Sequence, residues 1–156
     1  MLDLMFFVLG VAAAKPNVVF TMVDDWGHFN AGFQGNELAK TPVMDSLVRE
    51  GILLDRHYTY RFCSPTRRSF LSGRFPPHSG ESNAVSATID YRMSTIASRL
   101  EGYATAQLGK WHAGHFSLKQ IPISRGFDTS FGYFNGAQTH FTQQDSEDCG
   151  YNVTDF

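Results

Sequence analysis

Short apolar runs alternate with helix signals along this chain, and that alternation constrains the fold more than any other feature. Residues 17–23 form a nearly continuous apolar run, which is typical of a strand buried on both faces. Residues 52–59 and 103–108 predict two further strands. Strands separated by helices favour parallel pairing through right-handed crossovers. We therefore expect an α/β fold.

Helix boundaries are indicated by proline and polar caps at the start and by glycine after the end. From Gly109 onward the chain is rich in glycine, aromatic and polar residues, and we expect it to be mostly loop. Three helices are predicted: one from Thr41-Pro42 to just before Gly51, one opening at Ser64-Pro65 and running through Phe70-Leu71 to Gly73, and one over about 94–101.

Composition excludes several classes of protein. The chain has 156 residues, a formal net charge of −2 and 42% hydrophobic residues, which together suit one globular domain rather than a disordered chain. The slight acidity gives no electrostatic footprint for binding nucleic acid. Two cysteines cannot build a disulfide scaffold, and no apolar run reaches the length of a membrane span. The 14 phenylalanines predict a well-packed interior.

The first residues indicate entry into the secretory route. Residues 4–11 are apolar and are followed by Ala12-Ala13-Ala14, so we interpret residues 1–14 as a signal peptide and residues 15–156 as the domain. The basic leader usual in such peptides is missing, and an unstructured tail is the alternative interpretation. Asn152 begins an Asn-Val-Thr triplet, which is a glycosylation acceptor in secreted proteins.

Polar residues follow each predicted strand at the point where it ends. Asp24-Asp25 follow the first strand, Cys63 the second, and Lys110 with His112 the third. Ligands of open parallel sheets bind outside the carboxyl ends of the strands. We therefore expect these residues to meet at one crevice and form a functional site.

The two aspartates and the cysteine each have a functional and an ordinary interpretation. Two adjacent carboxylates suit a hard cation such as Ca²⁺ or Mg²⁺, while an exposed acidic loop is the alternative. Cys63 lies at a helix start, where the positive end of the helix lowers a thiol pKa; a buried thiol or a disulfide to Cys149 is the alternative. A cysteine-phosphatase loop is excluded, because Ser69 occupies the position that needs arginine.

The segment after the third predicted strand contains a lysine, Lys110, and two residues later a histidine, His112. If the segment is extended, Lys110 and His112 point the same way and can face an anion together. The alternative is a surface lysine beside a packed Trp111. The glycine spacing of a phosphate-binding loop is absent.

Taken together, these motifs resemble the sulfatase family, and arylsulfatase B-like enzymes most closely, within the alkaline phosphatase superfamily. The resemblance covers about residues 15–135. It rests on the following segments, which occur in the family's order: the strand ending in Asp24-Asp25, the Thr41-Pro42 helix start, Cys63-Ser64-Pro65-Thr66-Arg67 with Phe70-Leu71-Ser72-Gly73-Arg74, Gly109-Lys110-Trp111-His112, and Arg125-Gly126-Phe127-Asp128.

The resemblance implies a fold and a chemistry. The fold would be part of an alkaline-phosphatase-like sandwich, with a mostly parallel sheet and helices on both faces. Cys63 would be oxidised to formylglycine by the formylglycine-generating enzyme. One hydroxyl of the hydrated aldehyde would attack the sulfur of a sulfate ester and expel the alcohol. The second hydroxyl would then lose its proton, so that the carbonyl re-forms and sulfate leaves.

The same resemblance implies a role for each remaining site residue. Asp24, Asp25 and the modified Cys63 would help to hold one Ca²⁺. Arg67 would orient the hydrate, Lys110 would neutralise the sulfate oxygens, and His112 would assist deprotonation of the second hydroxyl.

We expect a sulfuric ester hydrolase of the extracellular, lysosomal or vacuolar space, acting on a small-molecule or glycan sulfate ester. A phosphatase or phosphonate hydrolase of the same superfamily and a catalytically silent secreted protein are the alternatives. Further metal ligands and a further sulfate-binding lysine of the resembled family lie beyond this segment. We therefore expect the chain to correspond to roughly the first third of such an enzyme and to be inactive alone.

Overall fold

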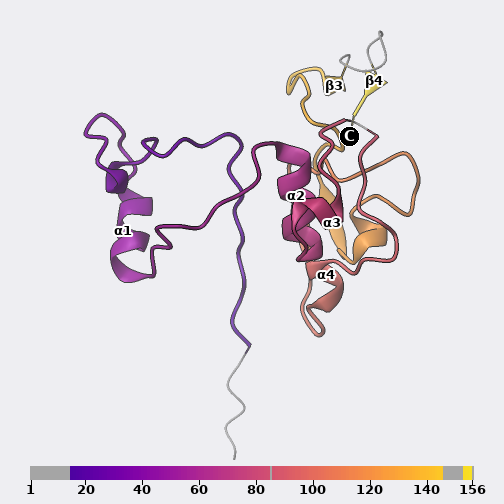
Figure 1. Cartoon of the computed structure of the whole chain (residues 1–156), viewed down its shortest axis with the longest axis horizontal. Coiled ribbons are helices and arrows are strands. Elements are labelled where there is room, and N and C mark those ends of the chain that lie inside the picture. The colour runs from indigo at the N-terminus through magenta and orange to yellow at the C-terminus, as the bar shows by residue number, and fades with distance from the viewer. Residues whose placement is uncertain (1–14, 85, 146–152, 156) are drawn as a thin grey trace, which may run out of the picture. The chain divides into compact units, whose positions relative to one another are not determined.

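The computed structural model describes residues 15–84, 86–145 and 153–155, and within them two compact units, residues 15–52 and the described residues from 53 onward (Figure 1). The predicted signal peptide, Cys149 and Asn152 lie outside the described residues. The elements are η1 (Gly32–Gln34), α1 (Pro42–Glu50), α2 (Cys63–Ser72), α3 (Pro76–Ser79), α4 (Ile96–Arg99), β1 (Ala106–Leu108), η2 (Ile123–Arg125), β2 (Thr129–Phe131), β3 (Gln144–Asp145) and β4 (Val153–Thr154).

The first unit is organised around the start of α1. Pro42 occupies the first turn, as predicted, and the Gly51 amide donates to the Leu47 carbonyl where the helix ends (2.8 Å). The Thr41 hydroxyl donates to the Asp45 carboxylate (2.8 Å), and this carboxylate also accepts from the Phe33 amide at 3.1 Å. These bonds hold the η1 turn against the first turn of α1.

Two of the three predicted strands are not formed. Residues 17–23 and 52–59 belong to no sheet in the described part of the chain. Their apolar side chains lie open to solvent, and Val19 and Ile52 are each 89% exposed. The prediction assumed burial on both faces. Without covering layers on the two faces, an apolar run loses the burial that stabilises a central strand.

The third predicted strand exists and has a parallel neighbour that the sequence did not reveal. β1 pairs with β2 in the register Ala106 to Thr129 through Leu108 to Phe131. The β2 segment was expected to be loop. It has only three residues, all exposed, and so short a segment shows no alternation of apolar and polar residues. Beyond β1 the two segments stay side by side, because the Gly109 amide donates to the Phe131 carbonyl (2.8 Å). A parallel pair with helices confirms the α/β class.

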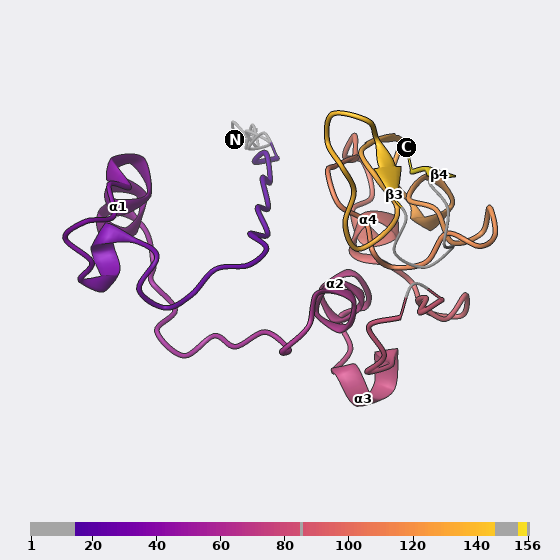
Figure 2. The same cartoon turned by 90° about the horizontal axis from the view of Figure 1, so that it is seen from above.

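The core of the second unit forms where α2 meets the segment after β1. It is built from Leu71, Ile89, Trp111 and Ala113, with Phe70, Met93, Phe127 and Phe134 packed against it. α3 lies beside α2 in both views (Figures 1 and 2). The third predicted helix is shorter than expected: α4 ends at Arg99, and Thr95 and Ser98 form a capping box at its start.

The interior is smaller than the phenylalanine content predicted. Among the described residues, Phe141 is fully exposed, and Phe20, Phe29 and Phe75 are more than half exposed. The expectation that the phenylalanines line a packed interior is therefore correct only for those around the second unit's core. No helix formed by the described residues is both long and apolar enough to cross a membrane.

Candidate active site

Cys63 is the first residue of α2 and carries a free, half-buried thiol. The preceding residue, Phe62, has an extended backbone and no side-chain oxygen to cap the helix. The Ser64 amide donates instead to the Asn83 side-chain carbonyl at 3.0 Å. The Thr66 hydroxyl donates to the Phe62 carbonyl at 2.7 Å. These bonds hold the backbone on both sides of Cys63.

One hydrogen bond connects the helix of Cys63 to the segment after β1. Arg67 lies one turn into α2, and its Nη1 donates to the main-chain carbonyl of Lys110 at 2.5 Å. Both side chains are half-buried. The structure therefore brings together the two motifs that contain Cys63 and Lys110, although they are more than 40 residues apart in the chain.

The segment 109–112 is anchored through its main chain and through Trp111. Trp111 is 2% exposed, its indole Nε1 donates to the Gly114 carbonyl (2.9 Å), and its ring makes an edge contact with Phe127. The His112 amide donates to the Phe134 carbonyl at 2.9 Å. A well-packed tryptophan thus fixes the main chain between Lys110 and His112.

His112 departs from the extended segment that the sequence predicted. Its φ is +47°, in the left-handed region that side chains other than glycine adopt rarely. The expectation that Lys110 and His112 point the same way assumed an extended strand through both residues, and the backbone of His112 is not that of a strand. The imidazole is buried against Gly136, where a Cβ would lie 2.8 Å from Cε1.

Arg68, next to the signature arginine, is 3% exposed, and its guanidinium donates to main-chain carbonyls. Its Nη1 donates to Ser79 (3.1 Å), its Nη2 to Ser82, and its Nε reaches Ser64 at 3.4 Å. Burial lowers the pKa of this guanidinium. These bonds give Arg68 a packing role between α2 and residues 79–82.

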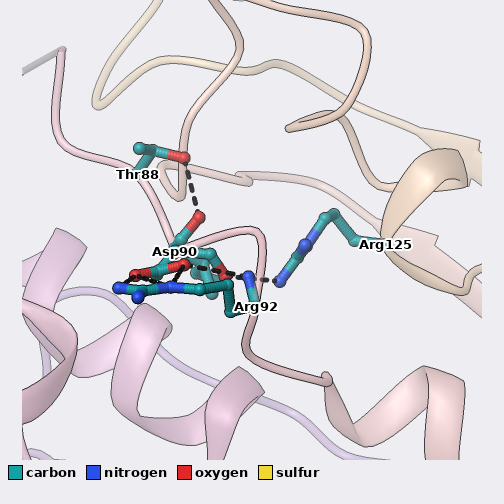
Figure 3. Close-up of polar contacts among 5 residues, drawn as sticks. Thr88, Asp90, Arg92 and Arg125 are labelled. Atoms are coloured by element: carbon teal, nitrogen blue, oxygen red, sulfur yellow. Dashed lines mark hydrogen bonds and ion pairs between the residues drawn. The ribbon is translucent and has the colours of Figure 1, made fainter.

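The motif that begins at Arg125 supports the core. Arg125 donates to the carbonyls of Met93 (2.6 Å) and Asp90 (3.4 Å), as Figure 3 shows for Asp90. Burial lowers the pKa of its guanidinium. Asp90 forms an exposed ion pair with Arg92, which lowers the pKa of the Asp90 carboxyl to about 2. These contacts hold the chain that leads into Phe127 and the core.

Asp24 and Asp25 lie in the first unit and are exposed. Neither follows a strand of the described residues. Their adjacent carboxylates are donors of the type that Ca²⁺ prefers, but two residues supply fewer than the six to eight oxygens, roughly, that the ion takes. Within residues 15–84, 86–145 and 153–155, no group of three or more acidic, histidine or cysteine side chains lies close enough together to hold a metal ion.

Asn83 and the role of Arg68 were missed by sequence reasoning. Asn83 belongs to no recognisable motif, and only the path of residues 79–83 beside α2 brings it to the Ser64 amide. No local signal marked Asn83, because the sequence itself predicts a capping serine, Ser64, at the start of this helix, and the cap position is in fact Phe62.

Comparison with known proteins agrees with this arrangement of motifs. The sequence model of one family, described as Sulfatase, matches residues 16–155. Arylsulfatase J from Mus musculus is 30% identical over 90% of this chain and 25% of its own length. Steryl-sulfatase from Mus musculus is 36% identical over 79% of this chain and 23% of its own length. The chain thus spans about a quarter of the length of these relatives.

A solved structure shares the fold. The crystal structure described as Ps i-CgsB superposes with a TM-score of 0.61 at 27% identity. The match covers 74% of this chain and 27% of that one. The α/β elements of this chain therefore correspond to one part of a larger fold.

Proposed function

The chain belongs to the sulfatase family, and on that premise we propose that it carries the nucleophile of an enzyme that hydrolyses sulfate esters. The observation that carries the proposal is the 2.5 Å bond from Arg67 to the Lys110 carbonyl. It joins the helix that begins at Cys63 to the segment that bears a cationic side chain. A cationic side chain on a segment bonded to the helix of the nucleophile supports attack on an anionic ester, because such a charge stabilises the anion.

In this proposal Cys63 is converted to formylglycine by a maturation enzyme of the secretory route. Once formed, that residue supplies a hydrated aldehyde; one of its hydroxyls attacks the ester sulfur, the bond from sulfur to the alcohol oxygen breaks, and the alcohol leaves. The first turn of α2 holds the main chain on either side of Cys63 through Asn83 and Thr66. A fixed main chain limits the positions of the reacting oxygen and so reduces the entropic cost of the attack.

Lys110 and His112 act on the charges that the reaction creates. Lys110 binds the sulfate oxygens and offsets the negative charge of the group under attack. Arg67 holds the Lys110 main chain and orients the nucleophile. His112 accepts the proton of the second hydroxyl. The imidazole is buried against Gly136, and this close packing limits its movement.

Asp24 and Asp25 fit part of a Ca²⁺ site by the chemistry of their carboxylates, and we propose that they contribute to one. The ion would supply a positive charge that favours ionisation of the attacking hydroxyl. We further propose that the protein travels the secretory route to the extracellular, lysosomal or vacuolar space. Its substrate would be a small-molecule or glycan sulfate ester.

The proposal is tested by replacing Cys63 in the whole protein. Cys63→Ala is expected to abolish release of sulfate from an aryl sulfate, because no other residue forms the hydrate. Cys63→Ser is expected to be almost as inactive, since the maturation step acts on the thiol. An aryl phosphate assayed in parallel separates a sulfatase from a phosphatase of the same superfamily. A Cys63→Ala protein with near-full turnover contradicts the mechanism.

A further inference from the structure

We infer that Asn83 is a positioning residue for Cys63, acting as a helix cap supplied from outside α2. The first amides of a helix have no partner within the helix, and a side-chain oxygen at the cap position usually satisfies one of them. In α2 the cap position is Phe62, which has no such oxygen. The Asn83 side-chain carbonyl accepts from the Ser64 amide at 3.0 Å in its place.

This cap acts directly on the backbone of Cys63. The nitrogen of Ser64 belongs to the peptide unit whose carbonyl is that of Cys63. A bond to this nitrogen therefore fixes the plane of the peptide that follows the nucleophile. A peptide plane that rotates would move the Cys63 side chain, and displacements of about 1 Å at a reacting group are enough to slow catalysis about 100-fold.

Arg68 holds Asn83 in position. Asn83 is itself exposed, so its place depends on the path of the preceding residues. The buried Arg68 guanidinium donates to the carbonyls of Ser79 and Ser82 and thereby ties residues 79–82 to α2. Gly80 allows this approach, because a Cβ there would lie 2.6 Å from Nη1 of Arg68.

The bonds form a closed circuit. Arg68 leaves α2, holds the segment that carries Asn83, and Asn83 returns to the Ser64 amide at the start of the same helix. Nε of Arg68 also reaches the Ser64 carbonyl at 3.4 Å. Both polar groups of the Ser64 main chain are therefore set by this circuit. The catalytic consequence of this positioning rests on the proposed function; the capping itself does not.

The test uses Asn83→Ala, which removes the accepting oxygen, and Asn83→Asp, which retains one. Glu81→Ala, an exposed change on the same segment, is the matched control. Because Asn83 is exposed, its replacement spares the core. Two quantities are measured in the whole protein: hydrogen exchange of the Ser64 amide, and kcat and KM for an aryl sulfate.

We expect Asn83→Ala to raise exchange at Ser64 about 5-fold, the effect of losing one hydrogen bond of about 1 kcal/mol. We expect its kcat to fall about 10-fold or more while KM stays near the wild-type value, because the nucleophile moves and the sulfate-binding groups do not. Asn83→Asp should restore slow exchange and most of the turnover, and Glu81→Ala should resemble the wild type.

Unchanged exchange at Ser64 in Asn83→Ala would overturn the inference. A loss of turnover that appears in KM, or that Asn83→Asp fails to rescue, would also overturn it. If the wild-type protein itself releases no sulfate, the proposed function fails, and the exchange measurement alone then decides whether Asn83 caps the helix.

Discussion

The hydrogen bond between Arg67 and Lys110 uses the side chain of Arg67 but only the main chain of Lys110, so replacing the two side chains should have different effects. The guanidinium of Arg67 donates to the main-chain carbonyl of Lys110. Lys110→Ala leaves that carbonyl in place, whereas Arg67→Ala removes the donor. The two variants are therefore expected to differ in stability even though both side chains serve the proposed reaction.

The magnitudes follow from the geometry. A hydrogen bond from a charged donor contributes about 1.5 to 3 kcal/mol to the free energy of unfolding. Because this pair is half-buried, we expect Arg67→Ala to lose about 1.5 kcal/mol through this bond, and Lys110→Ala to lose nothing through it. Each variant is expected to lose about 100-fold or more in turnover, the scale for removing one preorganised charge from a developing anion.

Urea unfolding followed by far-UV circular dichroism measures the first quantity, and release of sulfate from an aryl sulfate measures the second. Lys40→Ala, an exposed change in the first unit, is the control and should alter neither. Arg67→Lys should not recover turnover, because lysine lacks the planar fork that holds two oxygens. Equal destabilisation in Arg67→Ala and Lys110→Ala, or a Lys110→Ala protein as active as the control, would refute this reasoning.

Two further predictions concern stability. Trp111→Phe keeps an aromatic ring in the core but leaves the buried Gly114 carbonyl without the indole N–H that it accepts from. The free energy of unfolding measured by calorimetry should therefore fall by about 1 to 3 kcal/mol. The hydrogen bond from Arg92 lowers the pKa of the Asp90 carboxyl in the folded protein to about 2, from an ordinary value of 3.8. The contribution of Asp90 to the stability of the fold is therefore complete above about pH 4 and disappears as the pH falls towards 2. The Tm difference between wild type and Asp90→Asn should shrink over that interval; a difference that stays constant from pH 7 to pH 2 would contradict this assignment.

Local signals in the sequence predicted both ends of α1 and the end of α2, but they placed the start of α2 later than Cys63 and did not predict α3. Pro42 in the first turn and Gly51 after the last residue bound α1, and Gly73 ends α2 in the left-handed conformation with a φ of +66°. Each boundary depends on a few neighbouring residues, whose conformational preferences act whatever the rest of the chain does.

Strand pairing and the supporting contacts were predicted less well, because they depend on distant parts of the chain. Residues 17–23 have the pattern of a buried strand but lie exposed, whereas the exposed β2 pairs with β1. Motifs indicated Cys63, but nothing local marked Asn83, whose contact arises from the path that Arg68 imposes on residues 79–82.

The central claim is that Cys63 is the precursor of the nucleophile, and mass analysis of the peptide that spans it tests this most directly. The protein is secreted from a eukaryotic host, reduced, alkylated and digested, and the Cys63 peptide is compared with its synthetic thiol form. The account predicts the mass of an aldehyde at this residue, which is confirmed by trapping with a hydrazine reagent. An alkylated thiol or a disulfide at Cys63 in protein that releases sulfate would contradict it.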